Sequence, residues 1–252
     1  MSGLFWLTDE QMERLRPFFP KSHGKPRVDD HNLLSGMIFV NRNGLRWRAA
    51  PREYGSHKTL YNCWKRWRGM GVIMQIMDGL SAAKAETQTI MIDATYLKTH
   101  RTVSSLRLKN GDPGRLIEWT KDGMSTRLHA ITDQNGRSLS LFITAGQVSD
   151  YTDSSALLDS LPAAQWMLEN RGNDANWFKE ALKKKCIKPC IPERKSPNKP
   201  LKYDKRKYKR RNRIEIMCGR FKDWRRVATR YDRCPNVFFS TIDLATTVIF
   251  WI

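Results

Sequence analysis

The chain has 252 residues, 40% of them hydrophobic, which excludes global disorder and allows one large α/β domain or a small domain followed by a medium one. It carries 45 Lys and Arg against 25 Asp and Glu, and this net charge of +20 predicts a polyanionic partner, of which nucleic acid is the usual one. The charge is clustered, because residues 183–230 contain 20 Lys or Arg and only 4 Asp or Glu.

Cysteine usage and hydropathy indicate the compartment. The chain has five Cys, an odd number, and Met1–Leu7 lacks the basic and apolar stretches of a signal peptide, so a reducing, cytoplasmic location is expected. Cys186 and Cys190 are followed by no second ligand pair at zinc spacing and are interpreted as structural or incidental. Val237–Ile252 is apolar but contains Asp243 and is too short to span a bilayer, so it is predicted to be a buried helix, with no membrane partner.

Helical signals dominate the first third of the chain. The spacing predicts one helix between Thr8 and Pro17, a second from Asp29 or Asp30 to the turn at Asn43-Gly44, and a third that begins at Ser56. The third helix carries an apolar side with Leu60, Trp64 and Trp67, surrounded by the cations Lys58, Lys65, Arg66 and Arg68. This arrangement is loosely that of a helix-turn-helix, so residues 1–83 are expected to form a small all-α DNA-binding domain.

The pattern changes near residue 88. A short apolar run, 89–95, predicts a buried strand that ends at an acid, Asp93, and residues 99–125 read as a basic loop. Two strands, 127–132 and 139–144, are joined by a turn at 133–136 and form a predicted hairpin. The remaining expected elements are a helix at 152–161, a strand at 166–169, a helix at 175–185, a strand at 189–192, a loop to Tyr203, a basic helix at 204–226 and an apolar helix at 236–252.

This order of elements predicts a mixed sheet flanked by helices, the order of the ribonuclease H-like fold. We therefore expect an α/β class protein in which residues 88–252 form a ribonuclease H-like domain and residues 1–83 the preceding helix-turn-helix-like domain.

Acidic side chains on such a sheet suggest phosphodiester chemistry. Two Mg²⁺ ions can activate the attacking oxygen and stabilise the leaving oxygen, and hard Mg²⁺ prefers carboxylate ligands. Asp93 at the end of a buried strand is a candidate ligand, although a strand-ending Asp is by itself more often structural.

A second signal lies in the basic helix. Tyr208, Arg211, Glu215 and Lys222 follow at intervals of three, four and seven residues, so they are expected along one face of a single helix. A lone Glu among so many cations is usually part of a surface ion pair, but Ile and Met neighbours make these surroundings partly apolar.

At this point the chain resembles the DDE transposases of bacterial insertion sequences. Tyr208–Lys222 matches their Tyr-x2-Arg-x3-Glu-x6-Lys signature, and the resemblance runs over essentially the whole chain. Other matching stretches are Trp47-Arg-Ala-Ala-Pro with Tyr54-Gly, Asp93–Arg101, Lys121–His129, Gly146–Asp150, Arg171-Gly172 with Asp174, Pro189–Pro192, Gly219–Arg225 and the terminal Ile-Phe-Trp-Ile252.

The resemblance implies a catalytic and metal-binding triad, with Asp93 in the first position and Glu215 in the third. The second position departs from the family pattern Asp-Arg-Gly-Tyr-Asp, because this chain reads Asn170-Arg-Gly-Asn-Asp174. An Asn at this position offers a carbonyl oxygen but no charge, which weakens metal binding. Glu169 is not a substitute, since adjacent strand residues point to opposite faces, and Asp174 is a weaker substitute.

The resemblance also implies the partners. The expected activity is binding of double-stranded DNA at the terminal inverted repeats of the element, followed by strand cleavage and transfer to target DNA with Mg²⁺, or Mn²⁺ in its place. Pairing of two ends implies a homodimer or larger assembly in the bacterial cytoplasm, associated with the nucleoid. The expected DNA-binding residues are Tyr208, Arg211, Lys222, Lys58, Lys65, Arg66, Lys98, His100, Arg101 and Arg225.

Asn170 leaves alternatives open. The residue is explained by an engineered change that traps a DNA complex, or by natural loss of cleavage. The chain could then be a non-cleaving DNA-binding protein or self-repressor derived from a transposase, while a structure-specific nuclease of the same fold would have no need for the helical region. Trp119, in a polar loop, is a weaker candidate for stacking on DNA.

Overall fold

The computed structural model describes residues 3–20, 29–104, 116–120, 123–144, 158, 160–170, 176–192 and 203–252. The chain forms two compact units, one comprising Met1–Ala83 and Arg220–Ile252, the other Lys84–Gly219. This division differs from the sequence-based one, in which all of 88–252 belongs to a single domain. The functional division into a DNA-reading part and a catalytic part stays a prediction.

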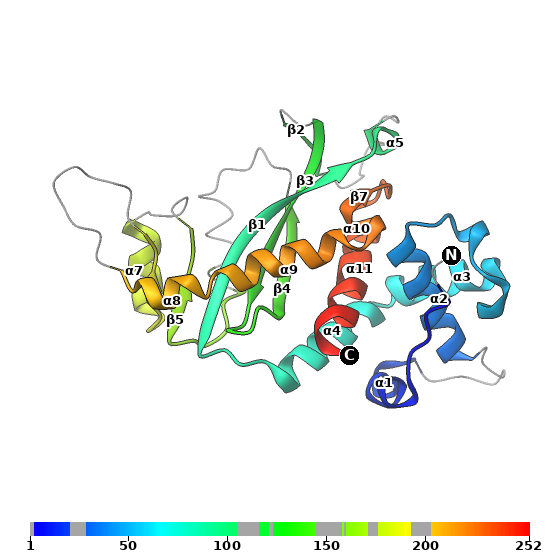
Figure 1. The fold of residues 1–252 in the computed structure, drawn as a ribbon, viewed down its shortest axis with the longest axis horizontal. Coiled ribbons are helices and arrows are strands. Elements are labelled where there is room, and N and C mark those ends of the chain that lie inside the picture. The colour runs from blue at the N-terminus through cyan, green and yellow to red at the C-terminus, as the bar shows by residue number, and fades with distance from the viewer. Residues whose placement is uncertain are drawn as a thin grey trace. The chain divides into compact units, whose positions relative to one another are not determined.

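The first unit is built almost entirely from helices (Figure 1). They are α1 (Asp9–Leu15), η1 (Arg16–Phe18), α2 (Asp30–Asn43), η2 (Trp47–Ala49), η3 (Arg52–Tyr54), α3 (His57–Gly69), α4 (Val72–Lys84), α10 (Arg225–Ala228), α11 (Pro235–Thr246) and the π-helix η5 (Thr247–Trp251), with the short strand β7 (Thr229–Arg230).

The predicted helix boundaries at this end of the chain are confirmed. Thr8 caps α1 in a capping box with Gln11, and the Asp29 carboxylate caps α2. Gly44 ends α2 in the left-handed conformation, with φ of 66°, which a residue without a Cβ adopts at low cost. Ser56 stands at the N-cap of α3 but makes no side-chain capping hydrogen bond.

The predicted helix at the end of the chain is also present, as α11 followed by the π-helical turn η5. Phe238, Ile242 and Leu244 of α11 are almost fully buried. Among the described residues, no helix has the length and apolarity needed to cross a bilayer.

The second unit contains a mixed sheet formed by β1 (Thr89–Thr99), β2 (Glu118–Thr120), β3 (Gly123–Thr132), β4 (Ser138–Thr144), β5 (Trp166–Leu168) and β6 (Lys188–Cys190). The strand order is β2-β3-β1-β5-β6, with β4 paired to β3. β1 is antiparallel to β3 and parallel to β5, and β5 is parallel to β6. An antiparallel β1-β3-β4 meander extended by two parallel strands on the other side of β1 is the ribonuclease H-like arrangement, which confirms the predicted fold.

Three expectations for this unit need correction. β1 does not end at Asp93 but continues to Thr99, because its pairing with β3 runs on to Lys98. The expected loop at 99–125 contains the short helix α5 (Arg101–Ser104) and β2, which carries Trp119. The expected helix at 204–226 is divided into α8 (Lys205–Lys209), α9 (Asn212–Lys222) and α10. Most of the helix expected at 152–161, and the loop at 193–202, lie outside the described residues.

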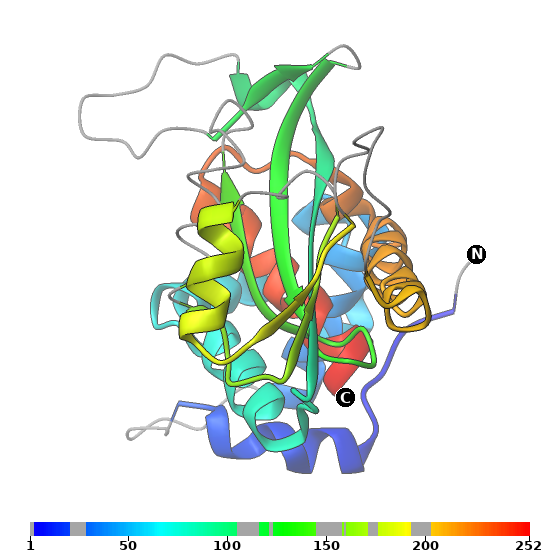
Figure 2. The ribbon, with the colours of Figure 1, turned by 90° about the vertical axis from the view of Figure 1, so that its left-hand side faces the viewer.

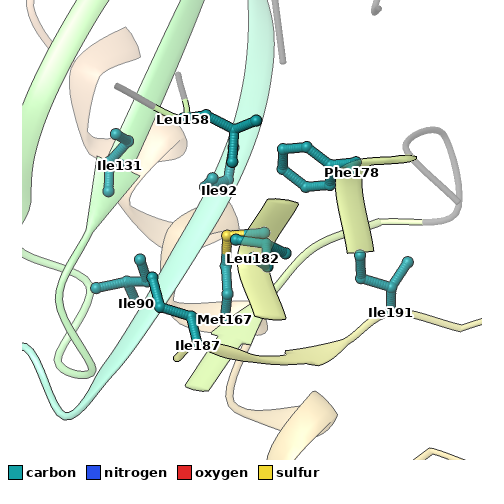
Figure 3. Close-up of a cluster of buried hydrophobic side chains, with 9 residues drawn as sticks. All are labelled: Ile90, Ile92, Ile131, Leu158, Met167, Phe178, Leu182, Ile187 and Ile191. Atoms are coloured by element: carbon teal, nitrogen blue, oxygen red, sulfur yellow. The ribbon is translucent and has the colours of Figure 1, made fainter. Parts of the chain in front are cut away.

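Side-chain alternation gives the sheet two different faces. Ile90, Ile92 and Met167 pack with Phe178 and Leu182 of α7 (Asn176–Lys184) in a buried apolar cluster (Figure 3). α8 and α9 lie on the opposite side of the sheet from α7 (Figure 2). Residues of β1 and β5 with the other parity therefore face α8 and α9.

Candidate active site

Asp93 and Asn170 meet on the α9 face of the sheet. β1 and β5 are parallel with Met91 opposite Leu168, and the same register continued by two residues puts Asn170 opposite Asp93. The Asn170 side-chain nitrogen lies 3.4 Å from Asp93 Oδ1, a long hydrogen bond. Two of the three predicted catalytic positions are therefore adjacent, and both side chains point toward α9.

Arg211 connects Asp93 to Glu215. Its Nη2 lies 2.8 Å from Asp93 Oδ2, and its Nη1 lies 2.7 Å from Glu215 Oε1. Asp93 and Arg211 are nearly buried, whereas the Glu215 side chain is 56% exposed. One planar guanidinium thus bridges both carboxylates with charge-assisted hydrogen bonds, and the third predicted catalytic position joins the first two.

The predicted single helix through these residues is wrong, but its spacing is informative. Arg211 lies between α8 and α9, so Tyr208 belongs to α8 and Glu215 to α9. The interval of four residues still brings Arg211 and Glu215 together. That interval was visible in the sequence, whereas the contact of Arg211 with Asp93 had no local signal.

Glu169 does not join this group. It follows β5 with the same parity as Met167, which belongs to the apolar cluster on the α7 face, and it is 1% exposed. The expectation that Glu169 cannot replace the missing carboxylate agrees with this burial pattern. Asp174, the other substitute considered, lies outside the described residues.

The start of α9 is held by the hairpin turn between β3 and β4. Arg213 Nη1 donates hydrogen bonds to the Gln134 carbonyl at 2.7 Å and to the Asn135 side-chain oxygen at 3.0 Å. Gly136 has φ of 79°, and a Cβ there would lie 2.9 Å from the Arg213 carbonyl oxygen. The turn therefore fixes the position of the backbone at Arg213, two residues before Glu215 in the sequence.

The other residues of the second unit that are predicted to contact DNA do not gather at one place. Lys98 is exposed on β1, but its parity places it on the face opposite Asp93. His100 follows β1 and its ring nitrogen lies 2.9 Å from the Thr102 hydroxyl, while Arg101 is exposed in α5. Tyr208 packs edge-on against Tyr203.

Five predicted DNA-binding cations belong to the first unit. Lys58, Lys65 and Arg66 are exposed on α3, whose opposite side buries Leu60, Trp64 and Trp67. Lys222 and Arg225 are also exposed. This amphipathic α3 leaves its cations available to a partner.

The groups that could hold a metal ion are two carboxylates and an amide. Within the described ranges, no three His, Cys, Asp or Glu side chains gather closely enough to form a metal site. Asp93 and Glu215 nevertheless share one cation, the Arg211 guanidinium, with the Asn170 amide beside Asp93. The donor set is of the hard oxygen type that suits a divalent ion, with one negative charge fewer than three carboxylates provide.

Comparison with known families assigns the chain. A family model described as "Putative transposase of IS4/5 family" matches residues 7–77, and one described as "Transposase DDE domain" matches residues 167–251. The second model includes both Asn170 and Glu215. The chain belongs to the DDE transposases of insertion sequences.

Two curated proteins are similar to parts of the transposase, and one of them is named as a putative transposase. The "Uncharacterized protein y4sN" of Sinorhizobium fredii is 32% identical over 108 residues, which cover 42% of this chain and 86% of that protein. The "Putative transposase for insertion sequence element IS6501" of Brucella ovis is 27% identical over 128 residues, which cover 50% of this chain and 98% of that protein.

Solved structures similar to the transposase are also transposases. A piggyBac transposase in a synaptic complex with hairpin DNA aligns with a TM-score of 0.49 and 8% identity, covering 98% of this chain and 73% of that one. The Mos1 transposase in a paired-end complex aligns with a TM-score of 0.28 and 12% identity, covering 91% and 80%. Because these scores are low, the fold assignment rests on the strand order and register described above.

Proposed function

We propose that this DNA transposase binds the terminal inverted repeats of its element, cleaves there with water and joins the resulting 3′ hydroxyl to target DNA. The observation that carries the proposal is the gathering of Asp93, Asn170 and Glu215 around Arg211, on one face of a ribonuclease H-like sheet.

In this proposal Asp93 and Glu215 hold divalent metal, two Mg²⁺ ions or Mn²⁺ in their place, and Asn170 stands at the second triad position, where the family has a carboxylate. The donor set fits, because both carboxylates already contact a single cationic group. When bound, the metal supplies activation of the attacking oxygen and stabilisation of the leaving oxygen. Arg211 offsets the charge of both carboxylates, and it would be able to contact a DNA phosphate when the carboxylates hold metal instead.

Asn170 makes the charge balance of the site unfavourable. Two divalent ions bring about four positive charges, and Asp93 and Glu215 provide only two negative ones beyond the scissile phosphate. The Asn170 carbonyl can keep the geometry but cannot supply the missing charge. We therefore expect this chain to bind DNA and to cut it poorly.

The proposal includes the DNA contacts and the assembly. Lys58, Lys65 and Arg66 of α3 are assigned to recognition of the ends, and the cations around the acids to backbone phosphates. Two paired ends require at least two copies of the chain, which light scattering on the end-DNA complex measures. The protein is expected in the bacterial cytoplasm, beside the nucleoid where its substrates lie.

The first prediction is that Asn170→Asp increases strand cleavage by about 100-fold or more, because it restores a charged ligand next to Asp93. The measurement is a cleavage time course on a duplex that carries the terminal repeats flanking the coding sequence, with Mg²⁺ and with Mn²⁺. DNA affinity, measured by fluorescence anisotropy in EDTA, should change little, since phosphate contacts come from Lys and Arg elsewhere.

Asn176→Asp is the matched control, because it makes the same chemical change at an exposed residue on the opposite side of the sheet. It should leave cleavage unchanged. If the unsubstituted chain already cleaves as fast as Asn170→Asp, the second ligand is a different residue, and Asp174 becomes the first one to test.

The alternative is a DNA-binding protein or self-repressor that has kept the fold without cleavage. The amide at position 170 is the specific observation that favours it. If Asn170→Asp stays inert while both proteins bind the ends tightly, this alternative replaces the enzymatic one.

A further inference from the structure

A basic pocket lies on the same face of the sheet as the acids, at the start of β1 and β5. It has a volume of about 300 Å³ and is lined by Gln88, Thr89, Gln165, Trp166, Asp204, Arg206, Lys207 and Arg210. Trp166 and Lys207 connect its two walls, because the Lys207 ammonium lies 3.7 Å from the centre of the Trp166 ring system. A cation–π contact at this distance positions the ammonium at the pocket wall.

The charge in this pocket is strongly unbalanced. Arg206, Lys207 and Arg210 line the pocket and contribute three cations. A fourth cation is close by, because the Lys188 ammonium lies 5.5 Å from the ring centre of Trp166, which also lines the pocket. Asp204 is the one acid that lines the described pocket, and its Oδ1 accepts hydrogen bonds from the backbone nitrogens of Arg206 and Lys207. Within the described ranges, none of the four cations forms an ion pair with a carboxylate.

Four cations with so little compensating charge repel one another, and an anion in the pocket relieves that repulsion. The side-chain amides of Gln88 and Gln165, paired across the start of β1 and β5, add hydrogen-bonding groups to the same space. A phosphate group matches both features, because it is anionic and accepts hydrogen bonds from Lys, Arg and amide donors.

The position of the pocket identifies the source of the phosphate. Thr89 and Trp166 are paired at the start of the parallel strands, four residues before Asp93 and Asn170 on the same face. Four residues of a strand span about 13 Å. Arg210 of the pocket also directly precedes Arg211 of the acidic site, so both sites lie along one stretch of chain.

We infer that this pocket binds backbone phosphate of the DNA strand, a few nucleotides away from the phosphate that would be cleaved at Asp93 and Glu215. Lys207 and Arg210 contact the phosphate, and Trp166 positions Lys207. The inference rests on the proposed function, because the acidic site supplies the second point that aligns the strand.

The test measures affinity for a labelled 30-base-pair duplex of arbitrary sequence by anisotropy at several salt concentrations in EDTA. The double variant Lys207→Gln/Arg210→Gln should bind about tenfold more weakly at low salt, with a slope of log affinity against log salt shallower by about two units. Lys183→Gln/Lys184→Gln is the matched control, since it removes the same charge from exposed residues of α7 on the other side of the sheet.

A variant that keeps the net charge distinguishes binding in this pocket from a general effect of positive charge on DNA affinity. Trp166→Leu should weaken DNA binding about threefold with the net charge unchanged, because Lys207 loses its aromatic support. Thermal unfolding of each variant verifies that the fold is kept, and only variants that melt like the parent protein are compared.

Two results overturn the inference. One is equal affinity and equal salt slope for the pocket and control double variants. The other is tight binding of inorganic phosphate at constant ionic strength that depends on Lys207 while DNA binding does not, which would make the pocket a site for free phosphate. Because the assay contains no metal, its outcome is independent of whether Asn170→Asp restores cleavage.

Discussion

Arg211 is the residue that connects the two candidate metal ligands. Its guanidinium contacts both Asp93 and Glu215, the two carboxylates that would hold a divalent ion. A cation attached to the chain and a cation from solution therefore compete for the same oxygens. Loss of Arg211 removes the competitor, but it leaves the nearly buried Asp93 without its counter-charge, whereas Glu215 is more than half exposed and is solvated by water.

We expect Arg211→Gln to bind Mn²⁺ about tenfold more tightly than the unsubstituted chain, as measured by electron paramagnetic resonance without DNA. In EDTA the same variant should be less stable by about 1–3 kcal/mol, because Asp93 loses its ion pair. The neighbouring Arg210→Gln removes the same charge and should change neither quantity to this extent. An unchanged or weaker Mn²⁺ affinity in Arg211→Gln would contradict the competition.

At the level of elements, the position of Glu215 depends on how α9 is attached to the sheet. The β3–β4 turn provides that attachment through Arg213, whose side chain donates to the turn while its carbonyl oxygen faces Gly136. The turn was predicted from the sequence, but its contact with a helix nearly 80 residues later along the chain was not.

Gly136→Ala is expected to destabilise the protein by about 1–2 kcal/mol through backbone strain at φ of 79°, and by more through the clash with Arg213. Urea unfolding followed by circular dichroism measures the effect. Gly123→Ala is the matched comparison, because it has φ of 105° but open space around its Cβ position. If Gly136→Ala is no less stable than Gly123→Ala, the turn does not support α9 in the way we infer.

At the scale of the whole molecule, one compact unit combines the two ends of the described chain. Leu34 and Ile38 of α2 line the same small apolar gap as Leu244 of α11 and Val248 of η5. The Thr241 hydroxyl of α11 also lies 3.4 Å from the Asn41 side-chain oxygen. Residues 220–252 therefore complete the core of the helical unit that residues 1–83 begin.

Residues 1–83 alone are consequently expected to lack a cooperative unfolding transition, since removal of α11 exposes the apolar side of α2. Joining 220–252 to this fragment through a flexible linker should restore a cooperative transition in urea, observed by near-ultraviolet circular dichroism. A fragment 1–83 that unfolds as cooperatively as the linked one would show that the first helices are self-sufficient.

The sequence by itself determined the properties that depend on local pattern. Helical and alternating periodicity, with capping residues such as Thr8 and turn residues such as Gly44, predicted most elements and their order. The order in turn predicted the ribonuclease H-like sheet, and the resemblance to the family pointed to Asp93, Glu215 and the Asn at position 170 as the candidate site, which stays a prediction. These residues can be found without a structure, because the motif is defined by residue types and by their spacing along the sequence.

Only the tertiary structure decided which of these residues meet. The register of β1 against β5 places Asn170 beside Asp93, and the break between α8 and α9 directs Arg211 toward both acids. Packing of α8 against the sheet brings Lys207 within reach of Trp166. Apart from the contact of Arg211 with Glu215, which is four residues away, these contacts join residues from 41 to 118 positions apart. Their partners are chosen by packing across the sheet, which leaves no periodic trace in the sequence of either segment.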